Sequence, residues 1–204
     1  MGPRSRTFLA LQILASLLCL ALLRPALAMD LQLSGKTALI TGSTGGIGFG
    51  IAKVLLKESG VRLSRFYLPG MKQRNWGRII FISSESALQI PVESVAYGMS
   101  KAAQIAVARG LAEGCAKTGV TVNSILPGPT LDADDPRAAR RFGGRSFAQA
   151  EEEFINTRRP TSLIKRFAHT DEVASLVAYV ASPLSSATTG AALRVDGGVV
   201  KSAF

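Results

Sequence analysis

Histidine and cysteine are scarce in this sequence. Its 204 residues include one histidine, His169, and two cysteines, Cys19 and Cys115. Metal centres and cysteine–histidine nucleophile systems need several such side chains close together, so we expect neither. Cys19 belongs to an N-terminal leader, which leaves Cys115 without a partner for an internal disulfide bond in the remainder. His169 precedes a predicted helix, where a role in the capping region is the simplest interpretation.

Acidic residues are also few compared with basic ones. The chain has 24 Lys and Arg against 14 Asp and Glu, a formal charge of +10, of which the leader contributes +3 and residues 29–204 carry +7. The most basic stretch, residues 137–145, could attract an anion, but Phe142 is its only aromatic residue and no nucleic-acid-binding motif surrounds it. A solvated helix or flexible loop is therefore favoured, and we expect no nucleic-acid partner.

Residues 1–28 have the composition of a targeting segment. A start with two arginines precedes a 16-residue apolar run, residues 8–23, and the small-x-small triplet Ala-Leu-Ala follows at 26–28. This order predicts a secretory signal peptide cleaved after the triplet, with an uncleaved membrane anchor as an alternative. If translation instead begins at Met29, residues 29–204 form a cytoplasmic domain. The single remaining cysteine gives no support to an extracellular design.

Apolar runs and helical patterns alternate along the rest of the chain. Short apolar runs that end near glycine or proline predict buried parallel strands at residues 36–40, 77–83, 120–126 and 191–195. Helices are predicted over residues 95–116 and from about Thr170, with Thr170 as the cap and Asp171 and Glu172 complementing the helix dipole. Strands that alternate with helices predict an α/β fold with a Rossmann-like, doubly wound parallel sheet. Residues 131–169 have few apolar positions and are expected to form a long connection over one edge.

A glycine-rich turn follows the first predicted strand. In the sequence TGSTGGIG, Gly42, Gly46 and Gly48 fall where a strand passes into a helix, so free N–H groups and the positive end of the helix dipole can meet a pyrophosphate. The spacing G-x3-G-x-G is neither G-x-G-x-x-G nor a phosphate loop that ends in Gly-Lys-Ser/Thr. By itself, such a turn is structural about as often as it binds phosphate.

Later motifs give this loop a specific meaning. The sequences ISSESALQIPVESVAYGMSK, VNSILPGPT and VDGG follow in order, and with them residues 29–204 resemble the short-chain dehydrogenase/reductase family. The family motifs match Thr41–Gly48 for the glycine loop, Ser84 for the catalytic serine, Tyr97 and Lys101 for Y-x3-K, and Asn123, Pro127 and Gly128 for N-x3-P-G. The resemblance implies an oxidoreductase that uses NAD or NADP. The cofactor-binding residues that it implies are Gly42, Ser43, Thr44, Gly46, Ile47, Gly48, Tyr97, Lys101, Pro127, Gly128 and Thr130.

The spacing of Tyr97 and Lys101 also has a chemical interpretation. Because they are four residues apart on one predicted helix, their side chains project from the same face. A phenol with an ordinary pKa near 10 is a poor proton source at neutral pH, and a nearby ammonium group is expected to lower that pKa. The resemblance implies that Tyr97 exchanges a proton with the substrate oxygen, that Lys101 also holds the nicotinamide ribose, and that Ser84 positions the carbonyl group.

Between the glycine loop and Ser84 the chain is much shorter than the family pattern. Three strands with their helices have no match, including an acidic residue for the adenine ribose, an Asn-Asn-Ala-Gly turn and a helix with a catalytic asparagine. The two flanking parts meet at about Glu58-Ser59. We therefore expect an internally truncated domain in which the choice between NAD and NADP is not determined.

Two functions follow from these observations. The leading hypothesis is hydride transfer between a small alcohol and its carbonyl compound, as in 3-oxoacyl reductases, by a chain that the resemblance implies is a homo-oligomer. The alternative is a catalytically impaired variant or fragment that acts at most as a binding or dimerising module. Ser84, Tyr97 and Lys101 favour the first hypothesis, and the missing half of the dinucleotide site favours the second.

Overall fold

A computed structural model of the chain describes residues 31–34, 36, 52–132, 142–143 and 145–203, all within the unit Leu31–Phe204. The predicted signal peptide, residues 1–28, and the glycine loop, residues 41–48, lie outside the described residues. In chain order the elements are α2 (Ala52–Gln73), β1 (Gly77–Ile82), η1 (Glu85–Ala87), η2 (Val92–Ser94), α3 (Val95–Glu113), β2 (Val120–Pro127), α5 (Phe147–Arg158), α6 (Thr170–Ala181), η3 (Pro183–Ser185) and β3 (Ala192–Val195).

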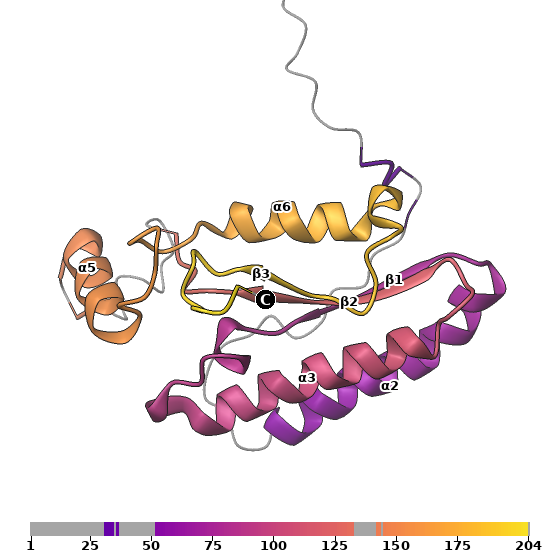
Figure 1. The fold of residues 1–204 in the computed structure, drawn as a ribbon, viewed down its shortest axis with the longest axis horizontal. Coiled ribbons are helices and arrows are strands. Elements are labelled where there is room, and N and C mark those ends of the chain that lie inside the picture. The colour runs from indigo at the N-terminus through magenta and orange to yellow at the C-terminus, as the bar shows by residue number, and fades with distance from the viewer. Residues whose placement is uncertain (1–30, 35, 37–51, 133–141, 144, 204) are drawn as a thin grey trace, which may run out of the picture. The chain divides into compact units, whose positions relative to one another are not determined.

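The described strands form one parallel sheet in the order β1-β2-β3 (Figure 1). The register places Gly77 opposite Val120 and Ser124 opposite Ala192. The strands predicted at residues 77–83, 120–126 and 191–195 are confirmed to within one residue at each end. The first predicted strand, residues 36–40, falls outside the described residues apart from its first position.

Helices cover both faces of this sheet. Figure 1 shows α2 and α3 on one face and α6 on the other. Apolar side chains of α3 and β2 form a core between them, in which Ala108, Cys115 and Val122 are at most 2% exposed. A parallel sheet between two helical layers is the α/β arrangement, so the predicted fold class is confirmed.

Helix α2 passes without interruption through the predicted join. It runs for 22 residues, so Glu58 and Ser59 lie within one helix rather than between two elements. The parts of the sequence that resemble an early and a later helix of the family are therefore one continuous helix, which leads directly to β1. Strand β1 is less covered than its neighbour: Ile82 is 47% exposed, whereas β2 is buried from Val120 to Leu126.

The connection at residues 131–169 has a small aromatic core of its own. It contains α5, and the rings of Phe142 and Phe167 stack with their centroids 6.4 Å apart. Phe147 meets both rings edge-on. Leu131, Ala150 and Ile155 are buried in the same cluster. The few apolar residues of this connection are spread thinly along the sequence, but they come together in space.

The helix ends differ from the predicted ones. Helix α3 ends at Glu113, three residues before its predicted end. Helix α6 begins at Thr170, but its N-cap is His169, whose backbone N–H donates to the carboxylate of Glu172 at 2.8 Å. The hydroxyl of Thr170 instead donates to Asp132 at 2.5 Å. The prediction that Thr170 is the cap is thus wrong, and the assignment of His169 to the capping region is confirmed.

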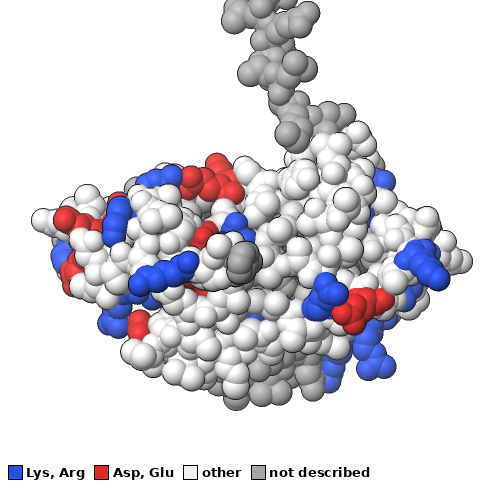
Figure 2. Space-filling model, viewed as in Figure 1, with Lys and Arg blue, Asp and Glu red and all other residues white. Residues whose placement is uncertain are grey.

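Charges on the visible surface are mixed. On the face in Figure 2, Lys and Arg side chains lie among Asp and Glu and do not form one basic stripe. Arg145 pairs with Glu153, and Arg166 pairs with Glu172 at 2.8 Å. Exposed pairs of this kind contribute only about 0–1 kcal/mol each. None of the helices in the described part of the chain is both long and apolar enough to cross a bilayer.

Asn123 connects β2 to the chain that precedes β3. Its side chain is fully buried, donates from Nδ2 to the Thr188 carbonyl oxygen at 2.8 Å, and accepts at Oδ1 from the Ala191 N–H at 3.1 Å. We predict that Asn123→Leu lowers the free energy of unfolding by about 2–5 kcal/mol, because two partly buried backbone groups lose their partners. Urea denaturation measures this loss.

The matched control for this prediction is Thr121→Val on the same strand. The Thr121 hydroxyl is buried and has no hydrogen-bond partner among the described residues, so its removal should leave stability nearly unchanged. Equal destabilisation by both substitutions would show that the hydrogen bonds of Asn123 are not what holds this region.

Candidate active site

Ser84 lies at the carboxyl end of β1, where the strand passes into η1. Its backbone is extended, with φ −168° and ψ 155°, and its Oγ accepts a hydrogen bond from the Ser86 N–H at 3.1 Å. The preceding N–H, of Ser83, donates to Ile125 of β2 at 2.8 Å and so fixes the turn to the sheet. Open α/β sheets bind ligands at the carboxyl ends of their strands, and Ser84 is in that position.

Two reciprocal hydrogen bonds hold α3 against this turn. The Ser83 hydroxyl donates to the Lys101 carbonyl oxygen, and Lys101 Nζ donates to the Ile82 carbonyl oxygen, both at 2.8 Å. Gly98 permits the close approach, since a Cβ at this position would lie 2.7 Å from the Ser86 carbonyl oxygen. The structure therefore brings Ser84, Tyr97 and Lys101 close together.

The acidity of Tyr97 is set mainly by its burial. Burial raises the pKa of Tyr97 because the phenolate loses hydration, while a hydrogen bond with Ser84 acts in the opposite direction. Two further charges act on it: Glu85 raises the pKa and Arg159 lowers it. The expectation that Lys101 lowers this pKa is not met, because its ammonium group bonds to the Ile82 carbonyl oxygen and lies 5.6 Å from the centroid of the phenol ring. Burial also lowers the pKa of Lys101.

Glu85 and Arg159 are part of this site, although the sequence analysis assigns them no role. Glu85 Oε2 accepts a 2.5 Å hydrogen bond from the Ser84 hydroxyl, and Glu85 Oε1 lies 2.7 Å from Arg159 Nε. The two charged residues are 74 positions apart in the sequence. The only sequence signal is an acidic residue directly after the serine in SSESA, and it does not indicate the partner.

The remaining predicted cofactor-binding residues fall into two groups. Those of the glycine loop, Gly42, Ser43, Thr44, Gly46, Ile47 and Gly48, lie outside the described residues. Pro127 is the last residue of β2, and Gly128 and Thr130 follow it, one strand away from Ser84. Gly128 packs so closely on the C-terminal loop that a Cβ would lie 2.5 Å from the Asp196 carbonyl oxygen. The Thr130 hydroxyl donates back to the Gly128 carbonyl oxygen at 3.0 Å.

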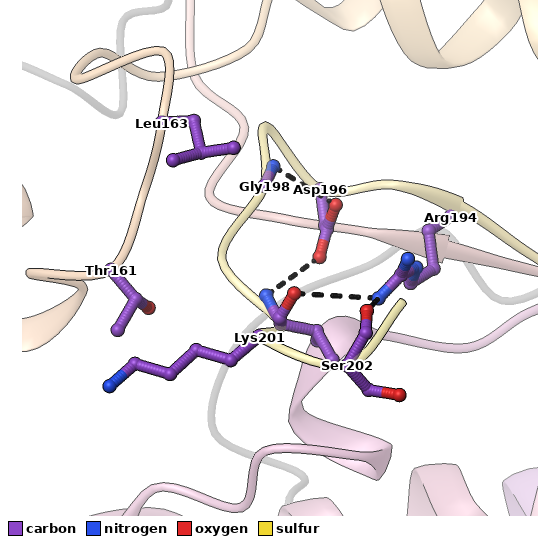
Figure 3. A pocket seen from close by; sticks show the side chains of 8 residues that line it. Thr161, Leu163, Arg194, Asp196, Gly198, Lys201 and Ser202 are labelled. Carbon is purple, nitrogen blue, oxygen red and sulfur yellow. Dashed lines mark hydrogen bonds between the residues drawn. The ribbon is translucent and has the colours of Figure 1, made fainter. Parts of the chain in front are cut away.

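A cavity of about 460 Å³ lies at the C-terminal loop and not at Tyr97. Its lining residues are Thr161, Leu163, Arg194, Asp196, Gly198, Val200, Lys201 and Ser202. Figure 3 shows that Asp196 hydrogen-bonds to backbone N–H groups of its own loop, at 3.1 Å and 2.9 Å, and that the Lys201 side chain extends away from it. Arg194 donates to the Ser202 carbonyl oxygen at 2.7 Å. Asp196 and Arg194 thus bond to the backbone of the loop itself rather than facing a ligand. We therefore place the candidate active site at Ser84 and not at this cavity.

The fold and this constellation agree with a family of α/β oxidoreductases. Residues 57–200 match the family model described as Enoyl-(Acyl carrier protein) reductase. The chain belongs to the short-chain dehydrogenase/reductase family, whose members are NAD(P)-dependent oxidoreductases.

Individual relatives support this assignment. The oxidoreductase YvaG of Bacillus subtilis (strain 168), itself uncharacterized, is 43% identical over 149 residues, which cover 72% of this chain and 56% of YvaG. D-β-hydroxybutyrate dehydrogenase of Cupriavidus necator is 32% identical over 145 residues, 70% of this chain and 55% of that enzyme. The crystal structure of L-sorbose reductase from Gluconobacter frateurii, complexed with NADPH and L-sorbose, superposes with a TM-score of 0.66 at 28% identity and covers 81% of this chain and 65% of that one. The chain thus spans little more than half the length of these two curated relatives, as expected for a shortened member.

We predict that the Tyr97 phenol titrates above its ordinary pKa and that Ser84→Ala raises this pKa further, because the variant removes the hydrogen bond that opposes burial. Carbon-13 NMR of labelled tyrosine side chains, followed as the pH is raised, measures both values, and Tyr97→Phe identifies the resonance. Ser175→Ala on α6 is the control. A Tyr97 pKa below 10, or one that Ser84→Ala leaves unchanged, would disprove this description of the site.

Proposed function

We propose that this chain is an NAD(P)-dependent oxidoreductase that interconverts an alcohol and a carbonyl compound. The observation that carries the proposal is the convergence of Ser84, Tyr97 and Lys101 at the carboxyl end of β1, with a hydrogen bond between the serine and the phenol. A group that transfers a proton, a second hydroxyl beside it and a cation are what reversible reduction of a carbonyl group requires.

In this proposal Tyr97 moves the proton. Its hydroxyl gives a proton to the carbonyl oxygen in reduction and takes one from the alcohol in the reverse direction. Its raised pKa keeps the phenol protonated at neutral pH, which is the form that reduction needs. Ser84 Oγ holds the substrate oxygen beside the phenol. The nicotinamide cofactor, when bound, supplies or accepts the hydride.

Lys101 fits the nicotinamide half of such a cofactor. An ammonium group has three N–H donors, and the Ile82 carbonyl oxygen accepts one of them at 2.8 Å, so donors remain for the ribose hydroxyls. We propose that the glycine loop binds the pyrophosphate and that Pro127, Gly128 and Thr130 border the nicotinamide. Residues that would select the adenine ribose have no counterpart in the sequence, and the proposal therefore includes both NAD and NADP.

An apolar substrate chain suits the surface beside Tyr97. Residues 85–95, which lead into α3, contain the apolar side chains Leu88, Ile90, Val92 and Val95, each at least 46% exposed. An acyl chain laid over these side chains would remove apolar area from water. Together with the similarity to D-β-hydroxybutyrate dehydrogenase, this favours a substrate of the 3-oxoacyl type.

A second candidate function is a binding or dimerising module without turnover. The observation that favours it is apolar exposure on the elements next to the join: Ile82 of β1 is 47% exposed and Phe66 of α2 is 76% exposed. In the unshortened family sheet a strand at the position of β1 has neighbours on both sides, and a shortened sheet offers it fewer. Such surfaces suit self-association, so we propose a homo-oligomer under either function.

The first test of the enzymatic proposal is Tyr97→Phe. We predict that it lowers kcat for reduction of a 3-oxoacyl thioester by about 10²-fold or more, the scale of a lost general acid. Steady-state assays with NADH and NADPH measure the effect, and thermal melts check that the variant stays folded. Tyr179→Phe on α6 is the control. Turnover that survives the loss of the Tyr97 hydroxyl would exclude this phenol as the proton donor.

The second test concerns cofactor affinity. We predict that residues 29–204 bind NADH and NADPH with dissociation constants on the order of millimolar, because contacts to the pyrophosphate and the nicotinamide half, without an adenine site, do not offset the cost of ordering the cofactor. Calorimetric titration measures this affinity beside a chimera that carries the missing segment of YvaG between Glu58 and Ser59, which should bind more tightly and melt at a higher temperature. Micromolar binding and an equally high melt for the shortened chain would instead show a complete cofactor site.

A further inference from the structure

A buried ion pair joins the serine turn to the chain that follows α5. The side chains of Glu85 and Arg159 are only 4% and 14% exposed, and Glu85 Oε1 lies 2.7 Å from Arg159 Nε. Burying two charges is costly unless they are paired and hydrogen-bonded. Arg159 also donates from Nη1 to the Arg158 carbonyl oxygen at 2.8 Å, and Glu85 accepts from Ser84 at 2.5 Å, so both charges have a second partner.

The hydrogen bonds around Ser84 define the direction of its hydroxyl group. A serine hydroxyl has one proton and two lone pairs. The proton goes to Glu85 Oε2, because an ionised carboxylate can only accept, and one lone pair accepts the Ser86 N–H at 3.1 Å. The Ser84 hydrogen bond that lowers the Tyr97 pKa needs the same proton, because only a donor stabilises the phenolate. Glu85 and the Tyr97 oxygen therefore compete for the Ser84 proton, and Arg159 holds Glu85 in place.

The charged groups that face the phenol come from three elements. Glu85 lies on η1, Arg159 follows α5, and Lys101 is on α3 with its ammonium group 5.6 Å from the ring centroid. Glu85 and Arg159 act on the Tyr97 pKa in opposite directions, the first raising it and the second lowering it. Loss of one charge therefore has an effect opposite in sign to loss of the other.

We propose that Glu85 and Arg159 are positioning residues of this site. The carboxylate holds the Ser84 hydroxyl proton away from the phenol, and the guanidinium fixes the carboxylate. The catalytic consequence rests on the proposed function: a substrate carbonyl can receive the Ser84 proton only when the hydroxyl turns away from Glu85, and the ion pair sets how readily it turns.

A second ion pair provides a matched control. Arg158 Nη1 lies 3.3 Å from Glu93 Oε1. This pair joins the end of α5 to η2, whereas the buried pair joins the residue after α5 to η1. Both of its side chains are at least 40% exposed, and neither acts on the Tyr97 pKa. Glu93→Gln therefore removes a neighbouring ion pair without changing the charge at the phenol.

The experiment is a carbon-13 NMR titration of Tyr97 in the folded chain and its variants. Glu85→Gln should lower the Tyr97 pKa, Arg159→Gln should raise it, and Glu93→Gln should leave it unchanged. Arg159→Lys keeps the cation and should restore the value of the unchanged chain. A purely structural role predicts that every destabilised variant moves toward the ordinary phenol value, so opposite shifts from Glu85→Gln and Arg159→Gln support the proposal. If Glu85→Gln does not fold, the comparison of Arg159→Gln with Arg159→Lys decides.

Steady-state kinetics separate this proposal from the proposed function. Where turnover is measurable, Glu85→Gln should raise kcat by about 10-fold with little change in KM, because an amide oxygen holds the Ser84 proton less tightly than a carboxylate does and the hydroxyl turns more readily to the substrate. Opposite pKa shifts in a chain without turnover would support the positioning role and count against the enzymatic function alone. A Tyr97 pKa and a kcat that respond to neither Glu85→Gln nor Arg159→Gln would overturn the positioning role, even in an active reductase.

Discussion

The candidate site depends on how closely α3 approaches the end of β1. Gly98 leaves room for this approach, and the paired hydrogen bonds between Lys101 and the Ile82–Ser83 backbone and side chain hold it. Since β1 is tied to β2 along six residues, the position of α3 is fixed to the central strand of the described sheet. Tyr97 reaches Ser84 only because these backbone distances are short, so the chemistry of the site is a consequence of main-chain packing.

Within that frame, burial and charge act on the same phenol in different ways. Burial penalises the phenolate, and the nearby Glu85 adds to the penalty, whereas Ser84 and Arg159 reduce it. Lys101 donates a hydrogen bond to the Ile82 carbonyl oxygen, and burial lowers its own pKa. The acidity of Tyr97 is therefore set by burial and by three neighbouring side chains, of which Glu85 and Arg159 belong to no spaced motif in the sequence.

Much of the fold could be predicted from the sequence because its signals are local. Strands β1, β2 and β3 are short apolar runs bounded by turn residues, and the four-residue spacing of Tyr97 and Lys101 determines a shared helix face. The rest depends on contacts between distant positions. The aromatic cluster draws on residues from Leu131 to Phe167, and the partner of Glu85 is 74 residues away, so no local pattern indicates either. Solvent exclusion, which reverses the expected pKa shift of Tyr97, likewise arises only when the layers have packed.

The aromatic cluster is a second hydrophobic core, separate from the one between α3 and β2. Two cores of unequal size in one chain can open at different free energies, so amide hydrogens of α5 need not exchange with solvent in the same event as those of β2. The ion pair of Glu85 and Arg159 joins the turn after β1 to the chain that follows α5, so it links the sheet to the smaller unit that contains α5. Opening of the smaller unit alone would leave Glu85 without its counter-ion while the sheet stays folded. The protonation equilibria around Ser84 therefore depend on the cooperativity between the two cores as well as on the geometry of the closed state.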